Sequence, residues 1–436
     1  MIGGKLAANS YHMTEATMAS EAPVQTNLGG TWPTTERPAH VPPEMVRDTV
    51  VYYQPTTDVD VFSATAGMHE TLPRVFFSLD KFGGAMEGSW VVTHYDDIRD
   101  VYQNAELYSS RETANFQQML GETWKMIPIS IDPPEHGKYR LLLNPWFSPK
   151  AINQMEPRIR ATINDLIDTF IDKGECDVAY DFGRLYPVRV FMDLMGFPAE
   201  KLEEFLQWEY ALLHSYGDVQ KMTWGIGSAV AYCREYIEEV RARPANNLTS
   251  HIVHGKVDGR PLTEDEIIGA VAFLWVGGLD TVAATTSLMI RRLCFDQALQ
   301  TKLRDNPALI PDAVEEFLRL HPIVNSPRLV TRDHELHGAK LKAGDWVSCF
   351  NSAGNFDEAE FSDPREFRLD RPSNRHFTLA GGAHRCLGSH LARRELRIAL
   401  GEFLRRVPQF DFKPGCDRAA SPGLIAMPRL PVVWKA

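Results

Sequence analysis

The stretch from residue 376 to residue 396 constrains the fold of this chain more than any other. A glycine-rich, irregular run ends at Cys386, and good helix formers follow from Leu391 to Leu396. A cysteine at the start of a helix meets unpaired backbone N–H groups and the positive end of the helix dipole, and both favour the thiolate over the thiol. We therefore predict that Cys386 is either a metal ligand or a nucleophile.

The residues around Cys386 bear on this choice. A nucleophilic cysteine needs a base, and His384 and His390 are close in the sequence. Glycines on both flanks of the cysteine remove side chains, which suits close approach by a large flat partner such as haem. These glycines are Gly381, Gly382 and Gly388. A third alternative is a buried cysteine without a chemical role, so the stretch alone leaves all three open.

The stretch resembles the haem-binding loop of the cytochrome P450 family. The matching residues are Gly382, His384, Cys386 and Gly388. Leu379 and Ala380 depart from the pattern, because the family usually has Phe and Gly there. The resemblance implies haem b with Cys386 as the axial iron ligand, and a mainly α fold, the triangular haem-thiolate prism, with a small β region.

A second stretch could hold the acidic groups of a haem. His136 and Arg140 follow Pro133 and Pro134 and lie four residues apart, on one face of the predicted helix. Taken alone, such a pair is more often a solvated surface. The pair matches the His-x-x-x-Arg element of the P450 family, and Arg328 matches a further haem-binding arginine. The resemblance therefore implies that His136, Arg140, Arg328 and His384 bind the two propionates.

Thr263 and Glu266 form a capping box that opens a long predicted helix ending near Arg292. Gly277 and Gly278 weaken its centre by about 1 kcal/mol each, and we expect the Thr281 hydroxyl to bond back to a carbonyl one turn earlier. A tight helix crossing at the glycines is the alternative. The string resembles the oxygen-binding helix of the camphor hydroxylase group, which implies haem contact at Gly277 and proton delivery by Thr281 and Asp280.

Other segments complete the expected fold. Runs typical of β-strands at residues 89–93, 329–331 and 346–350 predict a small sheet. Apolar residues at helical spacing between 150 and 255 predict core helices. Glu316 and Arg319 lie three apart and match the Glu-x-x-Arg element of the family. The resemblance implies that Arg371 joins them in a buried network that supports the cysteine loop.

Composition limits the class of protein. No linker divides the 436 residues, so we expect a flexible extension over residues 1–40 and one catalytic domain over residues 41–436. The six scattered cysteines indicate a reducing compartment. A net charge of -11 argues against nucleic-acid binding. We find no apolar run of the roughly 18 residues that a membrane span needs and no signal pattern, so we predict a cytoplasmic monomer that does not bind membranes.

The resemblance implies a monooxygenase that inserts one oxygen atom from dioxygen into a C–H bond of a small apolar substrate. We find no flavin, nicotinamide or iron–sulfur motif, so electrons must come from outside. The resemblance implies a [2Fe–2S] ferredoxin, served by a separate reductase, docking on the cysteine side near Arg393. The alternatives are a peroxide-driven peroxygenase and a non-catalytic haem-thiolate sensor, and a sensor would have no use for the Asp280–Thr281 pair.

The substrate pocket is predicted by motif alignment with the camphor hydroxylase group. Trp124 falls where that group has a hydrogen-bond donor, although core packing is the more common role of a tryptophan. The other predicted pocket residues are Phe116, Phe273, Val276, Val324, Asn325 and Leu424. Because they include no Arg or Lys to hold a carboxylate, we expect a compact neutral substrate such as a monoterpenoid, a norisoprenoid or a small aromatic.

Overall fold

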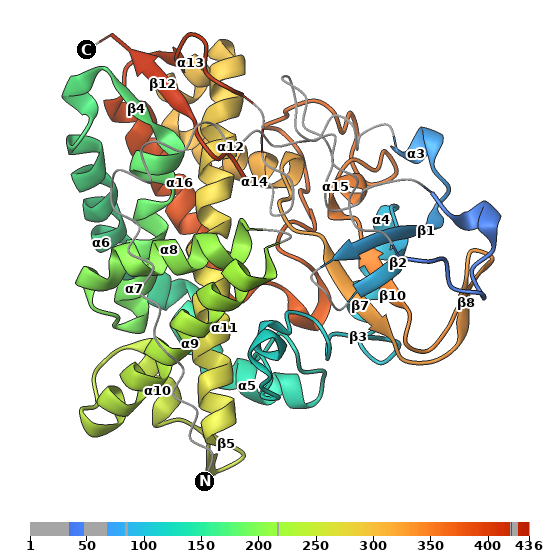
Figure 1. The fold of residues 1–436 in the computed structure, drawn as a ribbon. Coiled ribbons are helices and arrows are strands. Elements are labelled where there is room, and N and C mark those ends of the chain that lie inside the picture. The colour runs from blue at the N-terminus through green and yellow to red at the C-terminus, as the bar shows by residue number, and fades with distance from the viewer. Residues whose placement is uncertain are drawn as a thin grey trace. The chain divides into compact units, whose positions relative to one another are not determined.

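The computed structural model describes residues 35–47, 68–82, 86–215, 218–418, 420 and 426–435, and 54% of the chain is helical (Figure 1). The α-helices are α3 Met68–Thr71, α4 Tyr95–Gln103, α5 Glu135–Leu143, α6 Pro149–Asp168, α7 Leu185–Met195, α8 Leu202–Leu213, α9 Val219–Ala242, α10 Leu248–Val253, α11 Glu264–Leu279, α12 Thr281–Phe295, α13 Gln297–Asp305, α14 Ile310–Leu320, α15 Asn351–Gly354 and α16 Ser389–Arg406. The shorter turns that matter below are η2 Phe116–Leu120, η5 Val178–Gly183 and η8 Gly382–His384. The prediction of a mainly α fold is confirmed.

A five-stranded sheet gathers distant parts of the chain in the order β1-β2-β10-β7-β3. Its strands are β1 Val75–Phe82, β2 Met86–Val92, β3 Tyr108–Ser109, β7 Ser326–Val330 and β10 Trp346–Cys349. β10 runs parallel to β2, with Val347 beside Trp90, and antiparallel to β7, with Val347 beside Arg328. The three predicted β runs all belong to this sheet. The pairing also brings Arg328 of β7 from the middle of the sequence into the sheet.

Smaller β elements tie the end of the chain to the helical part. A three-stranded sheet has the order β11-β12-β4, and two short hairpins join β5 with β6 and β8 with β9. These strands are β4 Glu175–Asp177, β5 Lys256–Val257, β6 Arg260–Pro261, β8 His334–Leu336, β9 Ala339–Leu341, β11 Phe410–Phe412 and β12 Pro431–Trp434. Of the predicted extension over residues 1–40, only 35–40 are described. Thr35 N–H donates to the carbonyl of Leu79 there, next to the five-stranded sheet.

The successive helices α11 and α12 form the centre of the helical core. α11 packs on α7, α9 and α10, and α12 packs on α7, α14, α16 and η5 (Figure 1). The predicted apolar positions of the segment from 150 onward, such as Ile159, Ile163 and Phe170, are buried in the same core. The capping box at Thr263 and Glu266 is present.

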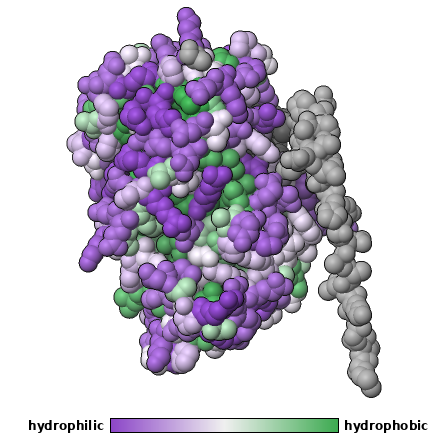
Figure 2. Space-filling model, turned by 90° about the vertical axis from the view of Figure 1, so that its left-hand side faces the viewer, coloured by the Kyte–Doolittle hydropathy of each residue, from purple (hydrophilic) through white to green (hydrophobic). Residues whose placement is uncertain are grey.

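By length and hydropathy, Glu264–Phe295 could cross a membrane, but 72% of its most apolar window is buried inside the protein. The face that carries α6 to α10, by contrast, is mostly hydrophilic, with apolar side chains grouped between polar ones (Figure 2). This distribution is that of a core helix enclosed by amphipathic helices.

The structure differs from the sequence prediction at the middle of this helix. The predicted single helix is interrupted at Asp280, where α11 ends and α12 begins. The Thr281 hydroxyl forms no back-bond to a carbonyl within the described residues; instead, Thr285 Oγ1 donates to the Thr281 carbonyl at 2.9 Å. The interruption therefore falls next to the glycine pair, as expected, but the proposed role of Thr281 in opening it was wrong.

Candidate active site

The loop that carries Cys386 is fixed by backbone bonds and close packing. Cys386 N–H donates to the Leu379 carbonyl at 2.9 Å, and α16 begins three residues later at Ser389. Gly382 has φ +62°, and a Cβ there would lie 1.9 Å from the Tyr102 carbonyl oxygen. Gly382 is therefore needed for packing on the end of α4, a role that the sequence did not reveal. Gly388 does face the sulfur, because a Cβ there would lie 4.0 Å from Cys386 Sγ.

The charge state of Cys386 is set by opposing influences. Burial raises the pKa of the thiol, whereas the Gly388 N–H and the charges of Arg140, Arg393 and Arg385 lower it. Burial has the larger effect, so the helix start alone does not stabilise the thiolate as expected. A bound metal cation would supply the missing stabilisation. Within the described residues, no hydrogen bond joins Cys386 to His384 or His390, which leaves a nucleophilic cysteine without its base.

The predicted propionate ligands converge from three elements. His136 and Arg140 lie on α5, His384 on η8 and Arg328 on β7. The rings of His136 and His384 are 4.2 Å apart, and the Nε2 atom of each is buried without a hydrogen-bond partner. Burial, followed by the nearby cations, lowers the pKa of His136 to about 4 and that of His384 to about 3. Both imidazoles are therefore neutral at physiological pH and can each donate one N–H.

The two arginines of this group lack a counter-ion. Arg328 is 3% exposed; its Nη1 donates to the Pro327 carbonyl, and its guanidinium lies 5.1 Å from the centre of the Tyr102 ring. Arg140 Nη1 donates to the Arg385 carbonyl at 2.8 Å. Among the residues that the structure describes, neither arginine forms an ion pair with a carboxylate. Buried cations without an anion are costly, so two buried donors and two unpaired guanidiniums fit the paired carboxylates of haem b.

Helix α11 has an open face near its C-terminal end. Phe273, Val276 and Gly277 lie on one face of α11 and are less buried than most of the helix, with Gly277 exposed. A Cβ at Gly277 would meet nothing closer than the Phe273 ring at 4.0 Å, whereas one at Gly278 would lie 2.4 Å from the Phe191 ring. The two glycines thus serve different purposes. Gly278 permits the helix crossing on α7, and Gly277 leaves space where a planar cofactor could approach.

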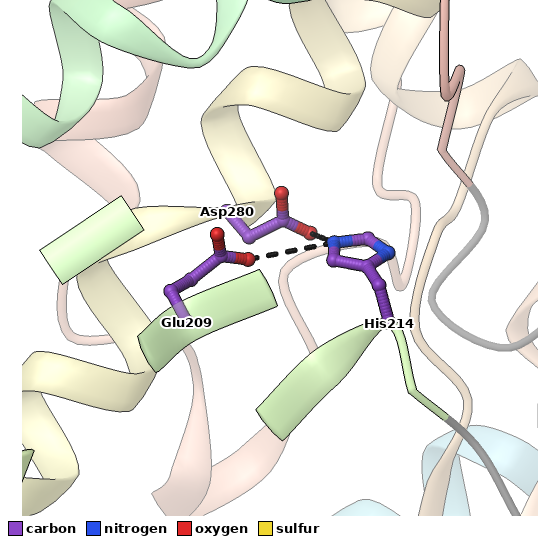
Figure 3. Close-up of side chains that lie close together, drawn as sticks. All are labelled: Glu209, His214 and Asp280. Carbon is purple, nitrogen blue, oxygen red and sulfur yellow. Dashed lines mark ion pairs between the residues drawn. The ribbon is translucent and has the colours of Figure 1, made fainter. Parts of the chain in front are cut away.

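Asp280 has partners that the sequence did not reveal. Its Oδ2 lies 3.2 Å from His214 Nε2, and the same nitrogen lies 3.4 Å from Oε1 of Glu209 (Figure 3). His214 follows the last residue of α8, and Glu209 lies within α8. Asp280 is therefore not simply an acid paired with Thr281. No short-range pattern links residues 209–214 with 280, so only the packing of α8 on the interrupted helix could have shown this cluster.

The remaining predicted pocket residues are placed less favourably for direct substrate contact. Trp124 is 4% exposed, and its indole N–H already donates to Glu122. Asn325 Oδ1 accepts from Asn351 N–H at 2.9 Å, and Val324 is 37% exposed. Phe116 on η2 packs against the same core cluster as Phe273, Val276 and Leu379. Leu424 lies outside the described residues.

The predicted network behind the cysteine loop is present in the structure. Glu316 accepts hydrogen bonds from Arg319 at 2.7 and 2.9 Å and from Arg371 Nε at 2.9 and 3.0 Å, and the Glu316 and Arg319 side chains are fully buried. Arg319 Nη1 donates to the Asn355 carbonyl, and the Asn355 side chain accepts from Phe377 N–H at 2.8 Å. The network thereby reaches the first residues of the loop.

Arg393, predicted to be near a docking surface, is engaged elsewhere. Its guanidinium binds Glu315 at 2.8 Å, and Glu315 also contacts His376 at 3.4 Å and Arg397 at 3.1 Å. The Arg393 side chain is only 18% exposed. It therefore ties α16 to α14 and to the start of the cysteine loop. Arg385, which is exposed, is the basic side chain next to Cys386 that remains accessible.

Together, the partly buried cysteine, the four cationic or donor side chains and the open face of α11 define a haem-thiolate protein. Residues 81–435 match the family model described as Cytochrome P450. A protein of Sinorhizobium fredii named "Probable cytochrome P450 127A1" is 37% identical over 87% of this chain and 92% of its own length. "Mycinamicin IV hydroxylase/epoxidase" of Micromonospora griseorubida is 32% identical over 80% of this chain and 90% of its own.

The fold matches solved structures equally well. The crystal structure of CYP101J2 superposes with a TM-score of 0.82 at 31% identity, over 92% of this chain and all of the other. This chain belongs to the cytochrome P450 family. The predicted family, fold, monooxygenase class and cofactor, haem b with an axial cysteine thiolate, are confirmed at the level of that family.

Proposed function

We propose that this protein is a ferredoxin-dependent monooxygenase that hydroxylates a compact neutral apolar molecule, of terpenoid-like size, with Cys386 as the axial iron ligand. The group of His136, Arg140, Arg328 and His384, in which all but the partly exposed Arg140 are buried, is the observation that carries the assignment of the haem site. It supplies four N–H donors from three elements to the space beside Cys386 and lacks a carboxylate partner among the described residues. The two propionates of haem b match it in charge and number.

The haem, when bound, supplies the chemistry of dioxygen activation. The chain supplies the rest. Cys386 Sγ would hold the iron of the haem, and Thr281 at the start of α12 offers a hydroxyl. The Thr281 hydroxyl forms no hydrogen bond within the described residues, so it is available to hold a water molecule. Asp280, one residue earlier, delivers protons to that water.

The substrate class follows from the pocket residues of this chain. Phe273 and Val276 turn an apolar face toward the space beside Gly277, and Phe116 packs against the same cluster. Trp124 N–H and the side chain of Asn325 already have partners. Such a pocket favours a compact neutral ligand over a fatty acid or a benzoate, because the predicted pocket residues include no cation that would pair with a carboxylate.

The electron partner is proposed on charge. Arg385 is exposed beside the cysteine, and Arg140, whose Nη1 donates to the Arg385 carbonyl, is only partly buried. A small acidic [2Fe–2S] ferredoxin fits this basic surface, and Arg385→Gln should raise the KM for the ferredoxin and reduce the salt dependence of electron transfer.

A cytoplasmic location and a monomeric state remain predictions, and gel filtration of the haem-loaded protein tests the monomeric state.

Carbon monoxide binding tests the axial ligand. The reduced protein should give the red-shifted Soret band of thiolate-ligated haem, and Cys386→Ser should lose it while keeping the haem content. The matched control is Cys416→Ser, since Cys416 is also partly buried but lies outside the site. If Cys386→Ser retained the red-shifted band, the assignment of the ligand would be wrong.

A ligand panel tests the substrate class. Monoterpenoids, norisoprenoids and small aromatics should shift the haem from low to high spin at lower concentrations than fatty acids or benzoates. Trp124→Phe then tests whether the indole N–H donates a hydrogen bond to the ligand. Selective weakening of an oxygenated ligand relative to its deoxygenated analogue would support a donor role, and equal weakening of both would leave Trp124 as core packing held by Glu122.

A further inference from the structure

Three side chains meet where the end of α8 packs beside the interruption between α11 and α12. Glu209 and Asp280 are 7% and 8% exposed, and the His214 side chain is 18% exposed. Both carboxylates turn toward the imidazole (Figure 3), and potential ligand atoms of all three residues lie within 4.8 Å of one another. Glu209 and His214 belong neither to the cysteine loop nor to the group of His136, Arg140, Arg328 and His384.

The oxygen atoms that face the imidazole are not satisfied. Glu209 Oε1 and Asp280 Oδ2 are buried and have no hydrogen-bond partner in acceptable geometry, although both lie near His214 Nε2. One N–H shared between two carboxylates gives each of them only a weak, bifurcated bond. The separations of 3.2 and 3.4 Å also exceed the roughly 2.7–2.9 Å of a charge-assisted hydrogen bond.

The same separations match the edges of a metal coordination sphere. Ligand atoms bound tetrahedrally to Zn²⁺ at about 2.0–2.1 Å lie roughly 3.3–3.4 Å from one another. An imidazole nitrogen with two carboxylate oxygens is a donor set that Zn²⁺ accepts readily, with water at the fourth position. The imidazole disfavours Mg²⁺ and Ca²⁺, which prefer oxygen ligands throughout.

Charge balance also favours a dication. Two carboxylates and one imidazolium leave a buried excess of one negative charge. Arg184 acts on Glu209 only at a distance and forms no ion pair with it within the described residues. A divalent cation with a neutral imidazole would neutralise both carboxylates.

We propose that Glu209, His214 and Asp280 form a binding site for one divalent transition-metal ion, with Zn²⁺ the best match. The ion links the end of α8 to the interruption between α11 and α12. It also occupies the carboxylate of Asp280, so bound Zn²⁺ slows product formation. This last consequence rests on the proposed function of Asp280 in proton delivery, whereas the binding site does not.

Metal binding by the haem-loaded protein tests the site directly. After dialysis against a chelator and then metal-free buffer, calorimetric titration with zinc chloride should show one Zn²⁺ per chain, with a Kd in the micromolar range or tighter. Glu209→Gln and His214→Gln should each weaken binding by at least about tenfold. Millimolar Mg²⁺ should not compete.

A surface histidine provides the matched control. His337 pairs with Asp97 at 2.8 Å, but its side chain is 43% exposed and Arg74 already neutralises that carboxylate. His337→Gln should leave zinc affinity unchanged. Zinc uptake of less than one ion per chain, or equal weakening in His337→Gln and His214→Gln, would overturn the proposal.

X-ray absorption of the zinc-loaded wild-type protein keeps the test independent of variant folding. It should show one imidazole and otherwise oxygen ligands at about 2.0–2.2 Å. Sulfur ligands or additional imidazoles would place the ion elsewhere and overturn the proposal. If zinc binds at this site without slowing turnover, the metal site stands and the proton-delivery role of Asp280 fails, so the two hypotheses are separable.

Discussion

Two parts of the site are built in opposite ways. The cysteine side consists of the loop before Cys386 and the residues that hold it, and the distal side consists of the end of α11 and the start of α12. On the cysteine side, Glu316 alone accepts hydrogen bonds from Arg319, Arg371 and Asn374, and Glu315 binds two arginines and a histidine. On the distal side, the central helix is interrupted at Asp280, and the carboxylates of Asp280 and Glu209 share one imidazole.

This difference indicates how stability and function are divided. Redundant buried ion pairs hold the loop that carries the iron ligand, so its geometry does not depend on any single bond. The distal side keeps a free hydroxyl, unsatisfied carboxylates and a glycine beside open space. In the proposed function these groups bind water, substrate and protons, which requires that the protein does not saturate them. Substitutions on the cysteine side should therefore act mainly on folding, and those on the distal side mainly on turnover.

The largest loss of stability is expected from Glu316→Gln. The change leaves Arg319 and Arg371 buried without their shared carboxylate and should lower the free energy of unfolding by about 3–5 kcal/mol. Urea unfolding and haem retention measure the effect. Glu106→Gln, which breaks the exposed pair with Arg332, should change the free energy of unfolding by no more than about 0.5 kcal/mol. Equal effects of the two would contradict the proposed rigidity of the cysteine side.

A smaller, pH-dependent loss is expected from Glu315→Gln. Burial alone would raise the pKa of Glu315, but hydrogen bonds and charge from His376 and Arg393 lower it to about 2. Because the folded pKa is depressed, the stabilisation is present above the unfolded value near 4.5 and is lost as pH falls toward 2. We expect a loss on the order of 2–3 kcal/mol at pH 7.

Thermal unfolding of wild type and Glu315→Gln between pH 7 and pH 3 measures this dependence. The difference between the two proteins should shrink as the pH is lowered. Glu204→Gln, which removes an exposed partner of Lys201, is the control and should not alter the profile. A constant difference at every pH would mean that the Glu315 charge is not what stabilises the loop.

On the distal side, Thr281→Val should change the free energy of unfolding by less than about 1 kcal/mol, because its hydroxyl forms no hydrogen bond within the described residues. Reductant consumption should continue, but oxygen should be diverted to hydrogen peroxide, with product yield reduced about tenfold or more. Thr285→Val, one turn later, removes the bond to the Thr281 carbonyl and should leave the yield nearly intact. If Thr281→Val formed as much product per reductant consumed as the wild type, the role of Thr281 in proton delivery would be refuted.

The smallest effect on folding is expected from Leu379→Phe, which restores the residue that is usual in the family. Leu379 is partly buried, and its carbonyl accepts the Cys386 N–H. An aromatic ring there should alter packing next to the sulfur and shift the reduction potential, as measured by spectroelectrochemical titration. A haem-loaded, folded variant with the wild-type potential would show that this position does not influence the iron.

Short-range patterns predicted part of this site well. The capping box at Thr263, the four-residue spacing of His136 and Arg140, and the β runs that contain Trp90 and Val347 were all confirmed as structural elements. Each depends on neighbours a few residues away, which the sequence displays directly. The contacts that the sequence did not reveal depend on distant partners. Gly382 packs on Tyr102, and Arg393 binds Glu315.

By itself, the sequence determined the capped start of α11, the β runs of the five-stranded sheet and, through the resemblance of its motifs, the family and the candidate iron ligand. Spacing, capping and glycine positions act within single helices, strands and loops. Only the tertiary structure decided the charge environment. Arg328 lies beside His384 because β7 pairs with β10, and Asp280 meets Glu209 and His214 because α8 packs on the interrupted helix. Electrostatic energies depend on distance and burial in three dimensions, so they can be assessed only once the fold has brought distant segments together.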